Sequence, residues 1–275
     1  DAYVAELVAV FREVRRVLRD DGTLWLNLGD SYASFRDGKA TPDSTRGDDV
    51  GTLVPKGSAM NRMASTFAGS RVKHKDLIGI PWRVAFALQA DGWYLRQDII
   101  WHKPNPMPES VRDRCTKAHE YIFLLAKSPR YYYDADAVKE QQTESTVARA
   151  AYGWNGRTDD NSNGARTGST FKRMAESGEK IGTIPSDGLR NKRSVWTVST
   201  KPYREAHFAT FPPDLIQPCI RAGCPAGGTV LDPFGGSGTT GEVAASEGRK
   251  AILIELNPEY VTLANKRGGL FVHSN

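Results

Sequence analysis

The sequence has little of what marks extracellular or membrane proteins. It has three cysteines, Cys115, Cys219 and Cys224, in 275 residues, and none of them forms a C-x-x-C pair. An odd number without such spacing predicts no disulfide framework and favours a reducing compartment. No apolar run approaches the length of a membrane span, and no secretory leader is recognisable. These absences predict a cytoplasmic chain that does not enter a membrane.

Metal-ligand spacing is also lacking, because the five histidines, His74, His102, His119, His207 and His273, form no ligand pattern typical of a metal site. No metal site is therefore expected. The charge is modestly positive, with a net value of +5 and a pI near 9.0. Such a balance suits a polyanionic partner without requiring one. The length is enough for one large α/β domain with insertions.

A strand, a glycine-rich turn, a helix and a second strand follow one another near the C-terminus. The pattern predicts strands at 229–231 and 251–254 and a helix at 239–247. The turn contains Gly235, Gly236 and Gly238. Glu255 follows the second strand, where an acid in a βαβ unit can accept hydrogen bonds from two ribose hydroxyls. The pattern therefore predicts nucleoside binding.

Few residues follow Glu255, so the rest of the sheet must come from earlier in the chain. Periodicity predicts further helices at 2–19, 77–90 and 213–221, and further strands at 23–28, 93–101 and 119–126. Two long polar stretches interrupt these elements, at 34–75 and 139–195. The second is basic and glycine-rich with scattered aromatics, which is typical of a disordered insertion or of a segment that folds on a partner.

Several motifs together resemble one enzyme family. They are VLDPFGGSGTTGEVA with AILIELNPEY, the preceding HFATFPPDLIQPCIRAG, and the upstream GTLWLNLGDSY, DIIWHKPNPMPES and HEYIFLLAKSPRYYYD. In this order they resemble S-adenosylmethionine-dependent amino-DNA methyltransferases of the permuted, β-class arrangement. The resemblance implies an α/β fold with a Rossmann-like, mixed and mostly parallel sheet of the class I methyltransferase type. It also implies an inserted DNA-recognition region, which divides the chain into a catalytic half at 1–138, the insertion at 139–195 and a cofactor half at 196–275.

The same resemblance implies which residues hold S-adenosylmethionine. Glu255 would bind the ribose and Asn257 would lie near the adenine. The cofactor would be lined by Asp232, Phe234, Gly235, Gly236, Ser237, Gly238 and Thr239, and its methionine end would meet Phe208, Thr210 and Phe211. Packing in the core remains an alternative role for Phe208 and Phe211, and capping of the strand end remains one for Asp232.

Double-stranded DNA is the expected partner. Trp101, Lys103 and Asn105 are candidates for contact with the base or a phosphate, and Arg157, Arg166, Lys172 and Arg173 are candidates for contact with the DNA backbone. The alternatives are that Trp101 belongs to the core, that Lys103 and Asn105 cap a turn, and that the basic residues lie in a solvated loop.

The family's catalytic motif [DSN]-P-P-[YFW] is missing from this sequence. The only Pro-Pro pair is Pro212-Pro213, inside the motif that meets the methionine end. Because the sequence opens with Asp1 inside an expected helix, we expect an N-terminal segment to supply this motif and a neighbouring central strand. The catalytic residues are therefore unknown. Pro218-Cys219 resembles the nucleophile of cytosine-C5 enzymes, but its place on an apolar helix face favours a core role.

The expected function is site-specific methylation of an exocyclic amine on a flipped DNA base, with cytosine N4 favoured over adenine N6. The alternatives are a methyltransferase fold that binds DNA without catalysis, and an RNA or protein methyltransferase. The resemblance suggests a prokaryotic or phage-encoded restriction–modification enzyme. It leaves open the target sequence, a homodimer and a cognate restriction endonuclease.

Overall fold

The computed structural model describes residues 2–33, 72–73, 75–143, 188–200 and 211–268. The N-terminal half consists of α1 (Ala2–Val17), β1 (Thr23–Leu28), α3 (Ile80–Ala90), β2 (Tyr94–His102) and β3 (His119–Ala126). A short connecting region follows, with the 3-10 helix η2 (Asp136–Val138) and the strands β4 (Glu140–Gln141), β5 (Leu189–Arg190) and β6 (Val195–Thr197). The C-terminal half consists of α6 (Pro213–Gly223), β7 (Thr229–Asp232), α7 (Thr239–Ser246), β8 (Lys250–Leu253) and α8 (Pro258–Gly268).

One mixed sheet organises the N-terminal half, with the strand order β1-β3-β2-β6. β3 pairs antiparallel with both β1 and β2, and β2 pairs parallel with β6. Five consecutive residues of β3, from Ile122 to Ala126, are buried. A strand that is apolar on both faces requires a layer on each side. The sheet is accordingly covered by helices on both faces.

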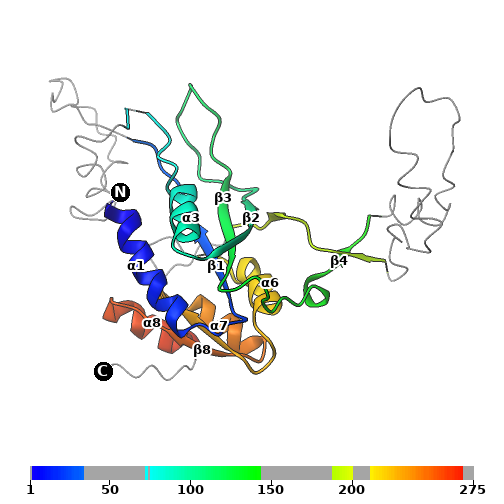
Figure 1. Ribbon diagram of the computed structural model, residues 1–275. Coiled ribbons are helices and arrows are strands. Elements are labelled where there is room, and N and C mark those ends of the chain that lie inside the picture. The colour runs from blue at the N-terminus through cyan, green and yellow to red at the C-terminus, as the bar shows by residue number, and fades with distance from the viewer. Residues whose placement is uncertain (1, 34–71, 74, 144–187, 201–210, 269–275) are drawn as a thin grey trace, which may run out of the picture.

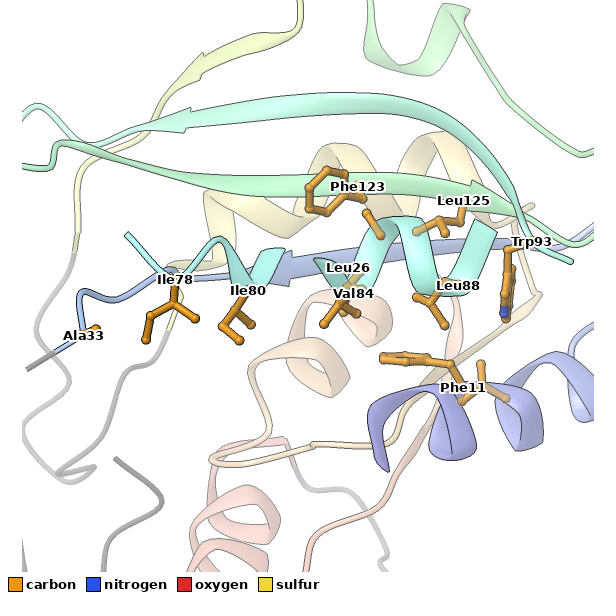
Figure 2. Close-up of a cluster of buried hydrophobic side chains, with 12 residues drawn as sticks. Phe11, Leu26, Ala33, Ile78, Ile80, Val84, Leu88, Trp93, Phe123 and Leu125 are labelled. Carbon is orange, nitrogen blue, oxygen red and sulfur yellow. The ribbon is translucent and has the colours of Figure 1, made fainter. Parts of the chain in front are cut away.

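Helices α1 and α3 cover the first face (Figure 2). Phe11 of α1 and Leu88 of α3 meet Phe123 and Leu125 of the sheet in one cluster of buried side chains. Gly79 is the N-cap residue of α3; it has a φ of 76° and no side chain to cap the helix. The carboxylate of Asp30 takes that role, accepting the backbone N–H of Gly79 at 2.9 Å and of Ile80 at 3.1 Å. This acid after β1 thus orients α3.

Helix α6 covers the second face. Leu215 and Cys219 pack against Trp101, Ile122 and Trp196 of the sheet. The same helix also touches the C-terminal unit, because Ile220 is buried against Val243 and Ala244 of α7. α6 therefore lies between the two halves of the molecule.

The C-terminal unit is a parallel pair, β7 and β8, connected by α7 (Figure 1). Within the described ranges, no strand pairing links this pair to the four-stranded sheet. Helix packing links them instead. Phe234 after β7 meets Phe11 of α1 edge to face at 6.3 Å, and Leu231 of β7 packs against the cluster between α1 and the sheet.

A third, two-stranded ladder of β4 and β5 lies away from the sheet, toward the right of Figure 1. Glu140 pairs with Arg190 in this ladder, and their side chains form an ion pair at 3.0 Å. The ladder brings together the two ends of the stretch between residues 143 and 188. Most of the expected insertion, residues 144–187, lies outside the described residues.

The expected class of fold is confirmed, and each predicted helix and strand in the described residues is present. Boundaries differ by a few residues: α1 ends at Val17 rather than at residue 19, and α3 begins at Ile80 because of Pro81. The four-stranded sheet is mixed, with two antiparallel pairings and one parallel pairing. No helix among the described residues is long and apolar enough to span a membrane.

A polar contact between α6 and the end of α7 gives a pH-dependent prediction. Arg221 donates to both carboxylate oxygens of Glu247, at 2.8 and 2.9 Å, and Gln217 donates to the same group at 2.7 Å. The hydrogen bond from Arg221 lowers the pKa of Glu247. Since Arg221 is partly exposed, we expect Arg221→Met to reduce the free energy of unfolding by about 1 kcal/mol at pH 7.

This contribution requires an ionised Glu247, so it is present above the carboxyl pKa of the unfolded chain, about 4.3, and is lost as pH falls through the lower folded value. Urea denaturation at a series of pH values below 7 should therefore show that the free energies of unfolding of the wild type and of Arg221→Met become equal in acid. Arg16→Met is the control, because Arg16 and its partner Glu13 are both largely exposed and their pair should contribute little. A difference that stays constant with pH would contradict the assignment.

Candidate functional site

The carboxyl ends of β1 and β7 lie at the same edge of the molecule. Both strands start near the end of α6: Thr23 of β1 donates its hydroxyl to the carbonyl of Gly223 at 3.3 Å, and β7 follows α6 directly. Both then pack against the cluster beneath α1. In open α/β sheets ligands bind at the carboxyl ends of the strands. The residues that follow β1, β2 and β7 are therefore the first place to look for a site.

The turn after β7 is held by hydrogen bonds within itself and to β8. The carboxylate of Asp232 accepts the N–H of Phe234 at 2.9 Å and the hydroxyl of Thr240 at 2.5 Å. The N–H of Gly235 donates to the carbonyl of Ile254 at 2.8 Å. The Asp232 contacts are those of a strand-end cap, which was the alternative role considered for this residue.

Glu255 connects the turn to the segment after β8. One of its carboxylate oxygens accepts the N–H of Gly236 and the other accepts the N–H of Asn257, both at 2.8 Å. A carboxylate has about four lone-pair sites, so each oxygen retains capacity to accept a hydroxyl. Asn257 in turn caps α8, since its side-chain oxygen accepts the N–H of Glu259 at 2.9 Å.

The three turn glycines are required for different reasons. A Cβ on Gly235 would lie 3.0 Å from the Cβ of Leu253, so packing explains this glycine, and Gly238 combines a φ of +84° with a Cβ position only 2.9 Å from the Cα of Ala264. Gly236 has a φ of +50°, and the nearest atom to its Cβ would be 3.9 Å away. Gly236 therefore faces open space, where a ligand can approach the backbone closely.

Two predicted cofactor residues point inward rather than toward this space. Ser237 and Thr239 are buried, and their hydroxyls accept hydrogen bonds from Arg267 of α8 at 3.3 and 3.0 Å. Arg267 also forms an ion pair with Glu242 of α7. The sequence did not indicate Arg267, because its partners lie about thirty residues upstream. Ser237 and Thr239 can still reach a ligand through their backbone N–H groups.

Two apolar side chains flank Glu255 and the turn at the surface. Phe234 is 55% exposed and Leu256 is 96% exposed. Such exposure of large apolar groups beside an ordered acid suits a flat, partly apolar ligand. The sequence analysis did not include Leu256 among the site residues. Its position, as an apolar residue between Glu255 and the helix-capping Asn257, could have indicated it.

The segment after β2 is held in place by an ion pair between Lys103 and Glu120 of the neighbouring strand β3. The ammonium of Lys103 also lies 4.2 Å from the ring centroid of Trp101. The amide of Asn27 in β1 donates to Glu120 at 3.2 Å. Glu120 and Asn27 were not among the predicted site residues. Together these contacts fix the start of the segment 103–118.

The ring of Trp101 belongs to the interior. It is 3% exposed, its N–H donates to the carbonyl of Val198 at 2.8 Å, and it packs in the cluster beneath α6. This placement favours the core alternative over stacking on a base. Phe211 packs against the same cluster, which favours a core role for it as well.

Asn105 binds a distant part of the backbone. Its side chain donates to the carbonyl of Thr200 at 3.2 Å and accepts the N–H of Thr200 at 3.0 Å. The contact connects the segment after β2 with the segment after β6. The remaining candidates, Phe208, Thr210, Arg157, Arg166, Lys172 and Arg173, lie outside the described residues.

The structure gives Cys219 no catalytic character. Its thiol is buried in α6, donates to the carbonyl of Leu215 at 3.8 Å, and has a pKa that burial raises well above its usual range. A nucleophilic cysteine requires the opposite shift. Among the described residues, no group of three or more His, Cys, Asp or Glu side chains is placed to hold a metal ion.

Comparisons with known proteins agree with this arrangement. The type II methyltransferase M.XycI of Xanthomonas campestris pv. cyanopsidis is 47% identical over 270 residues, covering 96% of this chain and 71% of the relative. In structure, the chain is similar to the PvuII DNA methyltransferase (cytosine-N4-specific), with a TM-score of 0.59 and 19% identity over 99% of this chain and 72% of the other. It is also similar to M1.HpyAVI in complex with S-adenosylmethionine, with a TM-score of 0.50 and 16% identity over 95% and 82% of the two chains.

The family described as DNA methylase, N6_N4_Mtase, matches residues 1–266, nearly the whole chain. This match confirms at the level of the family the expected cofactor, S-adenosylmethionine, and the expected substrate, DNA. The chain therefore belongs to the DNA methylase family of N6/N4 amino-methyltransferases.

Proposed function

We propose that this DNA methyltransferase transfers the methyl group of S-adenosylmethionine to the N4 amine of cytosine in double-stranded DNA. The observation that carries the proposal is the shared edge, at which the turn around Glu255 and the segment 101–110 both emerge. The segment reads WHKPNPMPES, which resembles the cytosine-N4 members more than the adenine-N6 members. Its prolines restrict the backbone, and such a rigid wall suits a base pocket.

The residues of the turn fit the cofactor. Glu255 offers acceptor sites to the two ribose hydroxyls, while Phe234 and Leu256 offer apolar surface to the adenine. Gly235, Gly236 and Gly238 use their own N–H groups within the turn and on Ile254 and Glu255, so with Asp232 they would shape the turn against which the remainder of the molecule lies. Ser237, Thr239 and Asn257 act mainly by holding the turn and the start of α8 in place.

S-adenosylmethionine supplies a methyl group on a positively charged sulfur. The exocyclic nitrogen of the base would take that methyl group while the carbon–sulfur bond breaks toward sulfur, and the nitrogen would release one proton. No covalent bond to the protein is needed, so positioning supplies much of the rate. Lys103 and Asn105 position the segment that borders the base, through Glu120 and Thr200. The proton acceptor is unassigned, because the [DSN]-P-P-[YFW] motif is not in this sequence.

We assign residues 1–138 to the catalytic half, 139–195 to target recognition and 196–275 to the cofactor half. The basic residues Arg157, Arg166, Lys172 and Arg173 would contact DNA phosphates within the middle region. A type II relative such as M.XycI supports a restriction–modification role in the bacterial cytoplasm, with a cognate endonuclease as a partner.

Removal of the Glu255 carboxylate tests the ribose contact. Glu255→Ala should weaken S-adenosylmethionine binding by about 1.5–3 kcal/mol, because hydrogen bonds to a charged group are lost. Isothermal titration calorimetry measures the change, and thermal unfolding reports whether the turn is retained. Glu259→Ala, one turn further into α8, is the control. Unchanged affinity in Glu255→Ala would mean that the carboxylate does not bind the ribose.

The open side of Gly236 gives a second test. Gly236→Ala should cost about 1–2 kcal/mol of stability through its positive φ, and it should also weaken cofactor binding at least tenfold because the new methyl projects toward the ligand. Gly248→Ala is a matched control: Gly248 has a φ of +71°, no atom lies within 4 Å of its would-be Cβ, and it is at the far end of α7. It should lose similar stability and keep full affinity. Equal affinities in the two variants would contradict the proposed position of the ligand.

The product identifies the methylated base. Unmethylated DNA treated with the enzyme and S-adenosylmethionine should yield N4-methyl-2′-deoxycytidine when digested to nucleosides and analysed by mass spectrometry. DNA incubated without the enzyme provides the background. N6-methyladenine as the sole product would replace the cytosine assignment, and 5-methylcytosine would refute transfer to an amine.

A further inference from the structure

The loop between β2 and β3, residues 103–118, extends beyond the sheet at the edge proposed to receive the DNA base (Figure 1). Its two ends are joined, because the N–H of Lys103 donates to the carbonyl of Ala118 at 2.8 Å. Within this loop the apolar side chain of Met107 is 85% exposed. The methyl transfer as proposed gives this side chain no role.

The backbone around Met107 is rigid. Pro106 and Pro108 stand on either side of it, and proline fixes its own φ and also restricts the residue that precedes it. On the N-terminal side, Asn105 exchanges two hydrogen bonds with the backbone of Thr200, at 3.2 and 3.0 Å. A side chain presented from such a backbone loses little conformational freedom when a partner covers it.

Glu109 anchors the loop on the C-terminal side of Met107. Its carboxylate accepts the N–H of Lys117 at 3.2 Å and the guanidinium of Arg114 at 2.6 Å. The same guanidinium lies 3.9 Å from the ring centroid of Tyr32, in the segment after β1. Anchors on both sides therefore fix the place at which the methionine is exposed.

The charges of the loop leave a positive excess. Both of its acids are already paired, Glu109 with Arg114 and Asp113 with Lys75, each at 2.6 Å. Arg112 is exposed and has no ion pair among the described residues. An unpaired cation and an exposed apolar side chain in one loop match the chemistry of a DNA duplex, which carries phosphates on its outside and stacked bases within.

We propose that Met107 enters the base stack of the duplex, in the space that a base leaves when it turns out of the helix, and that Arg112 contacts a neighbouring phosphate. This inference rests on the proposed methylation of a flipped base. Turning a base out of the duplex breaks its stacking. Methionine is among the apolar side chains that proteins insert between base steps, and its unbranched, polarisable thioether adapts to an irregular gap. The inserted side chain thereby stabilises the opened duplex.

Two duplexes, identical except that one contains a single abasic site, are the probe for the inserted side chain. The abasic site provides the gap without a base having to leave the stack, so the wild type should bind this duplex about tenfold more tightly than the intact one. Met107→Ala should bind both duplexes with equal affinity. Met107→Leu should keep the preference, because leucine also fills the gap. Fluorescence anisotropy with the whole chain measures each affinity.

Arg112→Gln tests the phosphate contact separately. It should weaken binding to the two duplexes by the same factor, because a phosphate contact does not depend on the gap. The slope of log affinity against log salt concentration should become shallower by about 0.9, the value for one phosphate contact. An unchanged slope would remove Arg112 from the proposed interface.

Phe86→Ala is the matched control, since Phe86 is 54% exposed and belongs to α3 rather than to the loop. It should keep the wild-type preference for the abasic duplex. A wild type without this preference would overturn the proposal, and so would a preference that survives in Met107→Ala. The result is distinct from that of the nucleoside analysis. Methylated DNA without the preference would refute only the inserted side chain, and the preference without methylated DNA would refute only the methyl transfer.

Discussion

Side-chain packing through α1 and α6 sets the position of the glycine turn after β7 relative to the four-stranded sheet. In the described part of the chain, β7 and β8 form one ladder and β1, β3, β2 and β6 form another, with no shared strand pairing. Phe11 of α1 reaches Phe234 beside the turn, and α6 packs against the sheet through Leu215 and against α7 through Ile220. In the proposed reaction, the distance between methyl donor and acceptor would thus depend on how tightly these two helices pack.

The turn itself is held by contacts within the protein. Glu255 fixes two backbone N–H groups, and Arg267 fixes the hydroxyls of Ser237 and Thr239. Little conformational entropy remains to be lost there on binding, which favours affinity. The same carboxylate both orders the turn and presents acceptor sites outward. For this reason, the structural and binding effects of replacing Glu255 have to be measured separately.

Sequence patterns were sufficient for the helices and strands and for the glycine turn, because each depends on neighbours within a few residues. They were insufficient for contacts made across the fold. Glu120 meets Lys103 only through the register of β2 and β3, and Asn105 meets Thr200 across 95 positions. The type of an apolar residue also does not show whether it packs in the core or contacts a ligand. Trp101 and Phe211 are apolar residues of the kind that line a base or cofactor site, yet both pack beneath α6.

Three contacts bring together the two ends of the stretch between residues 143 and 188. They are the hydrogen bond between Asn105 and Thr200, the parallel pairing of β2 and β6, and the ladder of β4 and β5. Once the ends of such a stretch are held, doubling its length adds only about 0.6 kcal/mol of closure entropy. Evolution can therefore lengthen, shorten or exchange this stretch at small cost to folding. Under the proposed role of this stretch in target recognition, a scaffold built in this way can acquire a new DNA target while its catalytic geometry is inherited unchanged.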